Sequence, residues 1–309
     1  MRTLAALLLF LGASPALAEG CKVESGADYR FEKTYAVRAV DDAHDRGSIR
    51  LATFVYRPLR ADRNQVVLFS HGSTNGQTID PREPTQLVPC SLKNYFLSRG
   101  FTLVAAMRRG RGESTGTFVE ECARNTDPRC TPRANREASD AALAQALADS
   151  NAVLDQIVFG KLAKPGEQVI LPGHSRGGLL SLALAAERPR RTAAVINFSG
   201  GWLGFQAPLA RGEEGRLRQE WHGDRLRRFG KGFSGPTLWL YAPEDPLLGE
   251  AVTRQFHAEY RAGGGVADYR ALSGPSLENG HLLYQESPLW AAAVDAFLSV
   301  TQPGKVAAR

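Results

Sequence analysis

Short apolar runs alternate with amphipathic stretches along most of the chain. The runs that suit buried parallel strands occupy residues 66–69, 101–106, 169–171, 193–198, 236–241 and 267–272. Apolar residues recur at helical spacing over residues 92–97, over 137–159, along the stripe of Val252, Phe256 and Tyr260, and along that of Trp290, Val294 and Phe297. Because a helix between two strands indicates a parallel crossover, this pattern predicts an α/β protein with a mostly parallel central sheet flanked by helices.

Two regions depart from this alternation. Residues 34–40 and 49–56 read as early strands that pair as an antiparallel edge. Residues 203–234 are polar, basic and punctuated by glycine, and we interpret them as a short cap excursion over the edge of the site, with a solvated helical face as the alternative. No repeat or linker marks a second domain, so the 309 residues predict one large α/β domain over 19–309 rather than two small ones.

The N-terminus has the pattern of a signal peptide over residues 1–18. Arg2 precedes an almost wholly apolar stretch over 4–11, and small residues lead to an A-x-A cleavage site at Ala18. The stretch is too short for a membrane anchor, and the residues before Cys21 differ from the small apolar run that precedes a lipidated cysteine. We therefore expect an exported protein, periplasmic or secreted, without stable membrane insertion.

Four cysteines remain after cleavage at that site: Cys21, Cys90, Cys122 and Cys130. An even number in an exported chain suggests two disulfides, which could connect in three ways. Cys122 and Cys130 flank a polar, turn-rich segment that a bridge would close into a small loop, which leaves Cys21 for Cys90. The spacing matches no zinc motif, so no metal is expected.

The composition is that of a soluble globular protein, with 43% hydrophobic and 23% charged residues. The formal charge of +6 falls to +5 when Arg2 leaves with the signal peptide. This balance favours anionic partners only in a general way. We expect a small-molecule substrate and no nucleic acid.

The most informative motif lies within residues 168–180, where G-x-S-x-G separates a strand from a helix. This is the pattern of a nucleophile elbow, a sharp turn that exposes one side chain above the sheet, here Ser175. Gly173 and Gly177 leave room beside it, and the N–H of Arg176 lies at the helix start, where it could stabilise an oxyanion. A glycine-rich loop that happens to contain serine is the alternative, but the flanking strand and helix favour the elbow.

A candidate acid and base follow later strands. Asp245 comes after one strand and His281 after the next, which completes the order Ser, acid, His with Ser175. Glu244 could serve in place of Asp245. We favour Asp245 because the acid usually follows its strand by a few residues and Pro246 fixes the turn.

The other histidines are assigned structural roles. His71 precedes the nucleophile, so we expect it to bond to the backbone rather than transfer a proton. His174 should point away from the site and pack, and His257 lies within a helix. His44 and His222 have no supporting context.

The chain resembles the dienelactone hydrolase and prolyl oligopeptidase-like branch of the α/β-hydrolase superfamily over roughly residues 34–300. The resemblance is carried by the Ser, acid, His order, by the loop 71–73 and by the segment 109–116. It implies that Ser73 supplies a second oxyanion N–H and that no cofactor is needed. The chain departs from the branch in having serine where dienelactone hydrolase has cysteine, and in lacking the propeller of prolyl oligopeptidases.

The function predicted is that of an exported serine hydrolase acting on carboxylic esters, with a carboxylesterase-type activity. An aminopeptidase or small-peptide hydrolase, and a non-catalytic binding protein on a hydrolase scaffold, are the alternatives. The glycine-rich segment 108–116 lacks the Lys-Ser/Thr of a phosphate-binding loop, so we read it as a rigid loop bordering the site.

We name Arg109 and Trp202 as candidate substrate contacts. A guanidinium such as that of Arg109 could bind a carboxylate on an anionic substrate. The alternative is that the arginines of this loop are solvated or tie loops to Glu113, Glu120 and Glu121.

Overall fold

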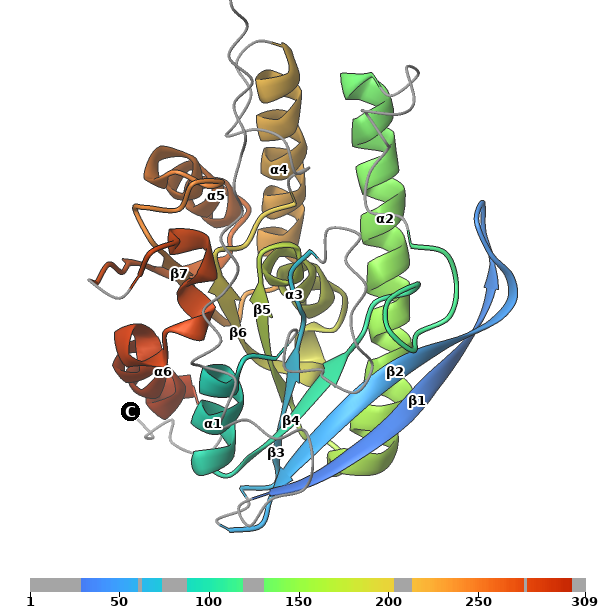
Figure 1. Ribbon diagram of the computed structural model, residues 1–309. Helices are drawn as coiled ribbons and strands as arrows, with labels where there is room; N and C mark the ends of the chain where they lie inside the picture. The colour runs from blue at the N-terminus through green and yellow to red at the C-terminus, as the bar shows by residue number, and fades with distance from the viewer. Residues whose placement is uncertain are drawn as a thin grey trace, which may run out of the picture.

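An eight-stranded sheet forms the centre of the protein, with its strands in the order β1-β2-β4-β3-β5-β6-β7-β8 (Figure 1). This computed structural model describes residues 29–60, 63–73, 88–118, 131–202, 213–274 and 277–301. The strands are β1 (Tyr29–Asp41), β2 (Arg46–Pro58), β3 (Gln65–Phe69), β4 (Phe101–Ala106), β5 (Val169–His174), β6 (Thr192–Phe198), β7 (Pro236–Tyr241) and β8 (Val266–Ala271). The helical segments are α1 (Cys90–Ser98), α2 (Pro132–Val153), η3 (Leu154–Leu162), α3 (Arg176–Glu187), η4 (Pro189–Arg191), α4 (Glu213–Gly232), α5 (Glu250–Ala262), η5 (Gly280–Gln285) and α6 (Ser287–Thr301).

The sheet is antiparallel at one side and parallel over the rest. β1 pairs with β2 along its whole length, from Tyr29 opposite Pro58 to Asp41 opposite Arg46, and β2 is antiparallel to β4. The pairs from β4 to β8 are parallel. The predicted antiparallel edge beside a mostly parallel sheet is confirmed. Both early strands are longer than predicted: β1 begins at Tyr29 rather than at residue 34, and β2 begins with three exposed residues before Ile49.

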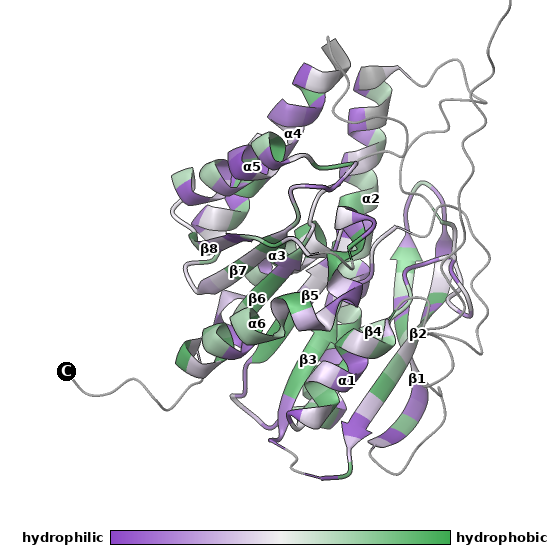
Figure 2. Cartoon of the chain, turned by 60° about the vertical axis from the view of Figure 1, so that its left-hand side comes forward, coloured by the Kyte–Doolittle hydropathy of each residue, from purple (hydrophilic) through white to green (hydrophobic). Residues whose placement is uncertain are grey.

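Helices cover both faces of the sheet and divide the core in two. In β7, Trp239 and Tyr241 point into the cluster that α2, α3, α4 and α5 complete. Leu238 and Leu240 alternate with them and point into the other cluster, where Trp290 of α6 and side chains of α1 lie. Because both faces are covered, the central strands are hydrophobic over most of their length (Figure 2).

The helix predicted over 137–159 begins earlier than its apolar stripe and continues as the π-helical segment η3. The hydroxyl of Thr131 accepts a hydrogen bond from the N–H of Ala134 (3.2 Å), which caps the first turn of α2. At the other end the N–H of Ala163 donates to the carbonyl oxygen of Val158 (2.7 Å), the longer repeat of a π-helix. A capped polar turn carries no hydrophobic periodicity, so the pattern could not show where the helix starts.

Most of the basic stretch 203–234 is the helix α4. One side of it is buried, as at Trp221 and Leu226, and it contacts α2, α3 and α5. Its basic side chains reach carboxylates on neighbouring helices, for example Arg225 with Asp140 of α2. This stretch is therefore an integral part of one helical layer, although its polar composition hides the buried stripe.

The predicted signal sequence over residues 1–18 lies outside the described residues, as do Cys21, Cys122 and Cys130. Cleavage and the two disulfide pairings therefore stay predictions. Residues 203–212 of the cap excursion predicted over 203–234 also lie outside the described residues, so a cap over the site edge stays a prediction. Among the helices that the structure describes, none combines the length and the apolar character needed to cross a membrane.

Candidate active site

Ser175 occupies the tight turn between β5 and α3. The strand ends at His174 and the helix begins at Arg176, so this one residue makes the reversal. Its backbone has φ 54° and ψ −122°, a combination that residues with a Cβ rarely adopt. Strain confined to one residue in this way is typical of functional sites.

The two glycines of the motif are required by close contacts. A Cβ at Gly173 would lie 2.1 Å from the carbonyl oxygen of Gly177. A Cβ at Gly177 would lie 1.9 Å from the carbonyl oxygen of Ser70, at the end of β3. Glycine at both positions therefore lets the start of α3 lie directly against β5 and the end of β3, and this contact fixes the position of Ser175.

His281 faces the Ser175 hydroxyl from the other end of the sequence. It lies in η5, whose first turn is capped by Asn279, because the side chain of Asn279 accepts a hydrogen bond from the N–H of His281 (3.0 Å). The Nε2 atom of His281 is 2.9 Å from Oγ of Ser175. Its Nδ1 atom is 2.9 Å from Oδ2 of Asp245. With Nδ1–H donating to the carboxylate, Nε2 is left as the acceptor for the serine proton.

Asp245 is held rigidly in the turn that follows β7. Its Oδ1 atom accepts hydrogen bonds from the N–H groups of Leu247 (2.8 Å) and Leu248 (2.9 Å). Its side chain has no exposed surface, whereas the adjacent Glu244 is exposed. Of the two carboxylates proposed from the sequence, Asp245 is the one in contact with His281.

The three predicted catalytic residues therefore come together from three separate loops near the carboxyl ends of parallel strands. A hydroxyl, an imidazole and a buried carboxylate in this order can move a proton from oxygen to nitrogen and stabilise the resulting imidazolium. That chemistry suits nucleophilic attack on a carbonyl carbon. The catalytic roles of Ser175, His281 and Asp245 stay predictions.

The loop after β3 borders Ser175. A Cβ at Gly72 would lie 3.3 Å from the Cβ of Ser175. Ser73 follows directly in this loop, and Arg176 begins α3 on the other side of Ser175. The two N–H groups predicted to bind an oxyanion thus belong to the segments that flank the serine, and their role stays a prediction.

The side chains of His71 and Arg108 hold the loop after β3 in place through hydrogen bonds to its backbone. Nδ1–H of His71 donates to the carbonyl oxygen of Gly72 (2.7 Å), and Nε2 accepts from the N–H of Arg108 (3.1 Å). The guanidinium of Arg108 donates to the carbonyl oxygens of His71 (2.7 Å) and Gly72 (2.6 Å). His71 bonds to the backbone as expected from its place before the nucleophile.

Of the remaining histidines, His174 is buried and stacks on Tyr284, with ring centroids 3.8 Å apart. Burial holds the pKa of His174 well below its ordinary value. The Nε2 atom of His257 is 3.2 Å from the carbonyl oxygen of Ala267, and this contact joins α5 to β8. His44 is exposed near the tip of the β1 and β2 hairpin.

His222 has a role that the sequence did not reveal. It is buried in α4, its Nδ1–H donates to the carbonyl oxygen of Arg218 (2.7 Å), and its Nε2 accepts from the N–H of Trp202 (3.0 Å). Its ring stacks on Phe256 of α5. Burial lowers the pKa of His222 to about 4, so the ring is neutral at neutral pH. The bond to Trp202 joins α4 to the loop after β6. The sequence could not predict this contact, because the two residues lie in different elements 20 residues apart.

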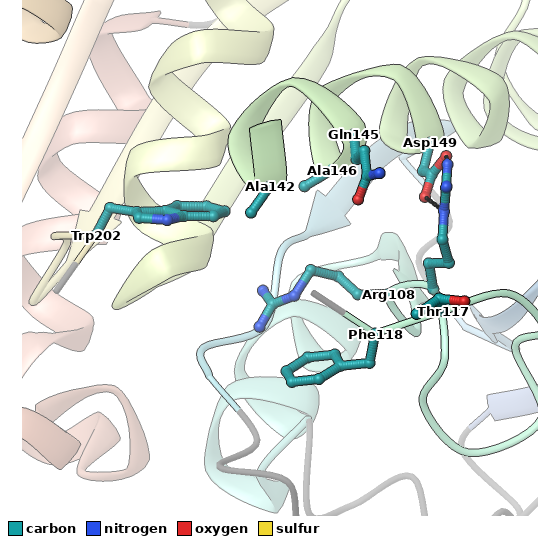
Figure 3. A pocket seen from close by; sticks show the side chains of 9 residues that line it. Arg108, Thr117, Phe118, Ala142, Gln145, Ala146, Asp149 and Trp202 are labelled. Carbon is teal, nitrogen blue, oxygen red and sulfur yellow. Dashed lines mark hydrogen bonds and ion pairs between the residues drawn. The ribbon is translucent and has the colours of Figure 1, made fainter. Parts of the chain in front are cut away.

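A pocket lies between α2, the loop after β4 and Trp202 (Figure 3). Arg108 and Phe118 line one side, and α2 lines the other (Figure 3). The lining residues are Arg108, Arg109, Thr117, Phe118, Ala142, Gln145, Ala146, Asp149 and Trp202. Trp202, a predicted substrate contact, therefore lines a pocket together with α2 and the loop after β4.

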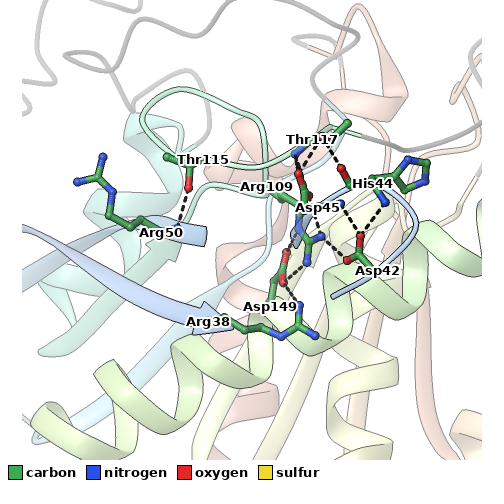
Figure 4. Close-up of polar contacts among 9 residues, drawn as sticks. All are labelled: Arg38, Asp42, His44, Asp45, Arg50, Arg109, Thr115, Thr117 and Asp149. Atoms are coloured by element: carbon green, nitrogen blue, oxygen red, sulfur yellow. Dashed lines mark hydrogen bonds and ion pairs between the residues drawn. The ribbon is translucent and has the colours of Figure 1, made fainter. Parts of the chain in front are cut away.

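Arg109 is bound differently from the prediction. Its guanidinium donates to Asp149 through two nitrogens (3.0 and 2.8 Å), to Asp42 (2.6 Å) and to Asp45 (3.0 Å) (Figure 4). Arg38 donates to the same Asp149 (3.0 Å). The Arg109 side chain is only 5% exposed. Because three carboxylates already bind this guanidinium, it has no pair of N–H groups left to bind a substrate carboxylate. The prediction that Arg109 binds the substrate is therefore corrected: Arg109 joins parts of the fold.

The carboxylates named from the sequence as alternative partners of the loop arginines are also different. Glu113 pairs with Lys33 (2.7 Å) and with the hydroxyl of Tyr35. Glu120 and Glu121 lie outside the described residues.

Within the residues that the structure describes, no group of three or more His, Cys, Asp or Glu side chains is placed to hold a metal ion.

No protein-family model matches the sequence, and no curated protein matches it significantly. Solved structures do resemble it. An esterase of Pyrococcus furiosus superposes with a TM-score of 0.56 at 13% identity, covering 89% of this chain and 92% of the other. Est1E of Butyrivibrio proteoclasticus gives 0.54 at 16%, covering 87% and 98%. A cold-adapted esterase from an Arctic intertidal metagenomic library gives 0.53 at 17%, covering 90% and 97%.

At such low identity these similarities establish the fold. The chain has the α/β-hydrolase fold, with a mostly parallel eight-stranded sheet and helices on both faces. The predicted fold class is confirmed.

Proposed function

We propose that this protein hydrolyses carboxylic esters of small substrates, with Ser175 as the nucleophile. The observation that carries the proposal is the chain of two 2.9 Å hydrogen bonds that joins Ser175 to His281 and His281 to Asp245. A serine hydroxyl is a weak nucleophile at neutral pH unless an adjacent base takes its proton. The orienting carboxylate keeps the proton of His281 on Nδ1 and leaves Nε2 free to act as that base.

In the acylation step, Oγ of Ser175 forms a bond to the ester carbonyl carbon while its proton passes to Nε2 of His281. The carbonyl π electrons move onto oxygen, where the N–H groups of Arg176 and Ser73 stabilise the negative charge. The electrons return, the bond to the alkoxy oxygen breaks, and His281 protonates the departing alcohol. An acyl-enzyme remains.

In the deacylation step, water replaces the alcohol. His281 takes a proton from water as the hydroxyl oxygen bonds to the acyl carbon, and the bond to Oγ breaks as Ser175 regains a proton from His281. The products are a carboxylic acid and the free enzyme. No metal or organic cofactor enters either step.

Esterases among the structural neighbours support esters over peptides as the substrate class. Hydrolysis of short peptides remains the runner-up, since the same three residues could serve it. Export places the activity outside the cytoplasm, and the signal-peptide pattern of residues 1–18 supports this.

The test combines a covalent probe with two substrate classes. The purified protein should react with a fluorophosphonate and hydrolyse short-chain esters faster than aminoacyl anilides, and Ser175→Ala should abolish both the labelling and the hydrolysis. Labelling that persists in Ser175→Ala would overturn the proposal. Faster cleavage of the anilides would favour the peptide hydrolase, and an unlabelled, inactive but folded protein would favour a binding role.

A further inference from the structure

We propose that the substrate ester carries a flat aromatic ring with an oxygen substituent, and that this ring lies in the pocket between Trp202 and Phe118. The inference rests on the proposed esterase function and adds the chemical class of the substrate. It is carried by the position of the pocket, by its walls and by one buried polar atom.

The pocket lies next to the nucleophile. The N–H of Gly201, one residue before Trp202, donates to the main-chain carbonyl oxygen of Ser175 (3.1 Å). On the other side, Arg108 lines the pocket and donates to the carbonyl oxygen of Gly72 (2.6 Å). A Cβ added at Gly72 would lie 3.3 Å from the Cβ of Ser175. The pocket therefore borders the segments that flank Ser175, and the proposal places one side of the bound ester in it.

Two aromatic side chains and two small ones shape the pocket. Trp202 is 4% exposed, and Phe118 has the guanidinium of Arg111 over its ring, 3.3 Å from the centroid. Between them, α2 presents Ala142 and Ala146, whose methyl groups leave space along the helix (Figure 3). Aromatic walls attract a ring by edge and face contacts beyond the area they bury, which a saturated ring of the same size cannot match.

Both aromatic walls are held in place before a substrate arrives. The backbone of Trp202 is fixed by the bond from its N–H to His222 (3.0 Å). The loop that carries Phe118 is anchored through Thr117, whose N–H and hydroxyl both donate to Asp45 (2.9 Å each). A preformed pocket of this kind loses little conformational entropy when a ligand binds.

The indole Nε1 of Trp202 provides the polar contact. It is buried and has no hydrogen-bond partner among the residues that the structure describes. Its nitrogen edge faces the side of the pocket where Arg108 and Phe118 lie (Figure 3). A buried donor without a partner is costly, and an oxygen on the bound ring would satisfy it.

Comparison with the other tryptophans supports this assignment. Nε1 of Trp221 donates to Asp140 and Nε1 of Trp239 donates to Thr237. Nε1 of Trp290 also lacks a partner within the described part of the chain, but that ring has no exposed surface and packs in the core between Tyr95 and Phe198. Trp202 differs because its unpartnered donor borders a pocket.

The experiment compares kcat/KM within one set of esters of matched reactivity. The acyl series is the methyl esters of 3-cyclohexylpropanoic, 3-phenylpropanoic and 3-(4-methoxyphenyl)propanoic acids. The alcohol series is the acetates of the corresponding 2-substituted ethanols. In one of the two series, the phenyl compound should exceed the cyclohexyl compound by about two- to tenfold, and the methoxy group should add a further factor of about two to ten. The series that responds identifies which half of the ester the pocket holds.

Variants separate the two contributions. Trp202→Phe keeps a ring and loses the donor, so it should remove the methoxy gain and keep the phenyl preference. Phe118→Leu should reduce the phenyl preference. Trp290→Phe makes the same chemical change on the other face of the sheet and should alter neither ratio. Each ratio is taken within one protein, so a change in overall activity does not affect it.

Equal kcat/KM for all three compounds in both series would overturn the inference and leave the esterase function standing. Ratios unchanged in both Trp202→Phe and Phe118→Leu would also overturn it. If no ester of either series is hydrolysed and the fluorophosphonate does not react, the proposed function itself has failed. The two failures are therefore distinguishable.

Discussion

The ring of His174 donates a hydrogen bond from Nε2 to the main-chain carbonyl oxygen of His281, 2.8 Å away. His174 directly precedes Ser175, so this bond ties the turn of the proposed nucleophile to the segment that carries the proposed base. The stacking partner Tyr284 lies in the same segment, η5. We assign His174 as a positioning residue, because it bonds to the backbone of His281 and its ring lies 5.0 Å, centroid to centroid, from the imidazole of His281.

Replacing His174 with Leu should lower kcat by about ten- to a hundredfold with KM nearly unchanged, because a small displacement of the base slows chemistry more than binding. The measurement is steady-state kinetics on a short-chain ester beside thermal unfolding. His174→Gln, whose amide can donate from the position of Nε2, should recover most of the loss in kcat. If both variants lose kcat only in proportion to lost folded protein, His174 is structural and has no positioning role.

Asp245→Asn should reduce kcat by about three to four orders of magnitude with little loss of stability. The N–H groups of Leu247 and Leu248 hold the Oδ1 position, so the Asn oxygen takes that place and its NH₂ group faces Nδ1 of His281. The histidine must then accept at Nδ1 and carry its proton on Nε2, where it cannot take the proton of Ser175. Esterase assays at neutral pH check this prediction.

The matched control for the acid is its neighbour. Glu244→Gln should leave kcat within about twofold, because Glu244 is exposed and is not the carboxylate that contacts His281. The opposite ranking of the two variants would mean that the wrong carboxylate has been assigned.

Gly177→Ala should destabilise the protein by at least about 2 kcal/mol, because the new methyl group would lie 1.9 Å from the carbonyl oxygen of Ser70. The backbone there must shift, and it is continuous with the turn that carries Ser175. Gly249→Ala is the control, since a Cβ at Gly249 meets no atom of the described residues within 4 Å, and it should stay within about 0.5 kcal/mol. Denaturant unfolding of both variants decides the matter, and similar midpoints would contradict the close packing of α3 against the end of β3.

Arg109→Met should cost about 3 kcal/mol of stability at neutral pH, because it leaves the buried carboxylate of Asp149 without its two-pronged partner. Arg46→Met is the control. Arg46 and Asp41 also form an ion pair, but both side chains are almost fully exposed, so the loss should be under about 1 kcal/mol. Comparable losses in the two variants would show that burial does not strengthen the Arg109 cluster.

The Arg109 cluster should also weaken in acid. Burial raises the pKa of Asp42, but hydrogen bonds from Arg109 and from main-chain N–H groups outweigh it and hold the pKa below the ordinary 3.8. A carboxyl whose pKa is lower in the folded state adds stability above the unfolded pKa and loses it as pH falls below that value. The difference in melting temperature between the wild type and Arg109→Met should therefore shrink from about pH 4 downward. A constant difference between pH 6 and pH 3 would contradict this.

His222 should make the protein less stable in mild acid. The unfolded chain has the ordinary histidine pKa of 6.5, whereas burial lowers the folded value to about 4. Between these values the unfolded state binds more protons, so stability falls as pH drops from 6.5 to about 4 and then levels off. Between pH 7 and pH 5 the loss due to His222 should be about 2 kcal/mol.

His174 shifts in the same direction, so the contribution of His222 must be isolated by subtraction. His222→Gln keeps an acceptor for the N–H of Trp202 and does not titrate. Its unfolding free energy should fall less than that of the wild type between pH 7 and pH 5, by that same amount. Parallel pH profiles would show that His222 is not held neutral by the fold.

Sequence patterns anticipated the fold and the three residues of the hydrogen-bond chain because each depends on local order. A strand, a glycine-flanked turn and a helix identify Ser175 in the sequence, and Asp245 and His281 each follow a strand. The partners of Arg109 could not be read in this way. They lie on the β1 and β2 hairpin and on α2, and only the folded chain brings these elements together.

The hydrogen bond from His174 to His281 could not be predicted from the sequence either, because it joins residues 107 apart in the chain. The buried stripe of α4 was hidden for a different reason. Its exposed side carries so many arginines that the average polarity of the stretch 213–232 conceals Trp221, His222 and Leu226.

The distance of 106 residues between Ser175 and His281 also sets an order of events during synthesis. A ribosome that adds about 5 to 20 residues per second needs roughly 5 to 20 s to travel from one to the other. Throughout that interval the nascent chain can carry Ser175 but not the imidazole that would take its proton. In the proposed mechanism Ser175 therefore stays unreactive until β8 and η5 have been made, and a chain cut short before residue 281 should have no esterase activity.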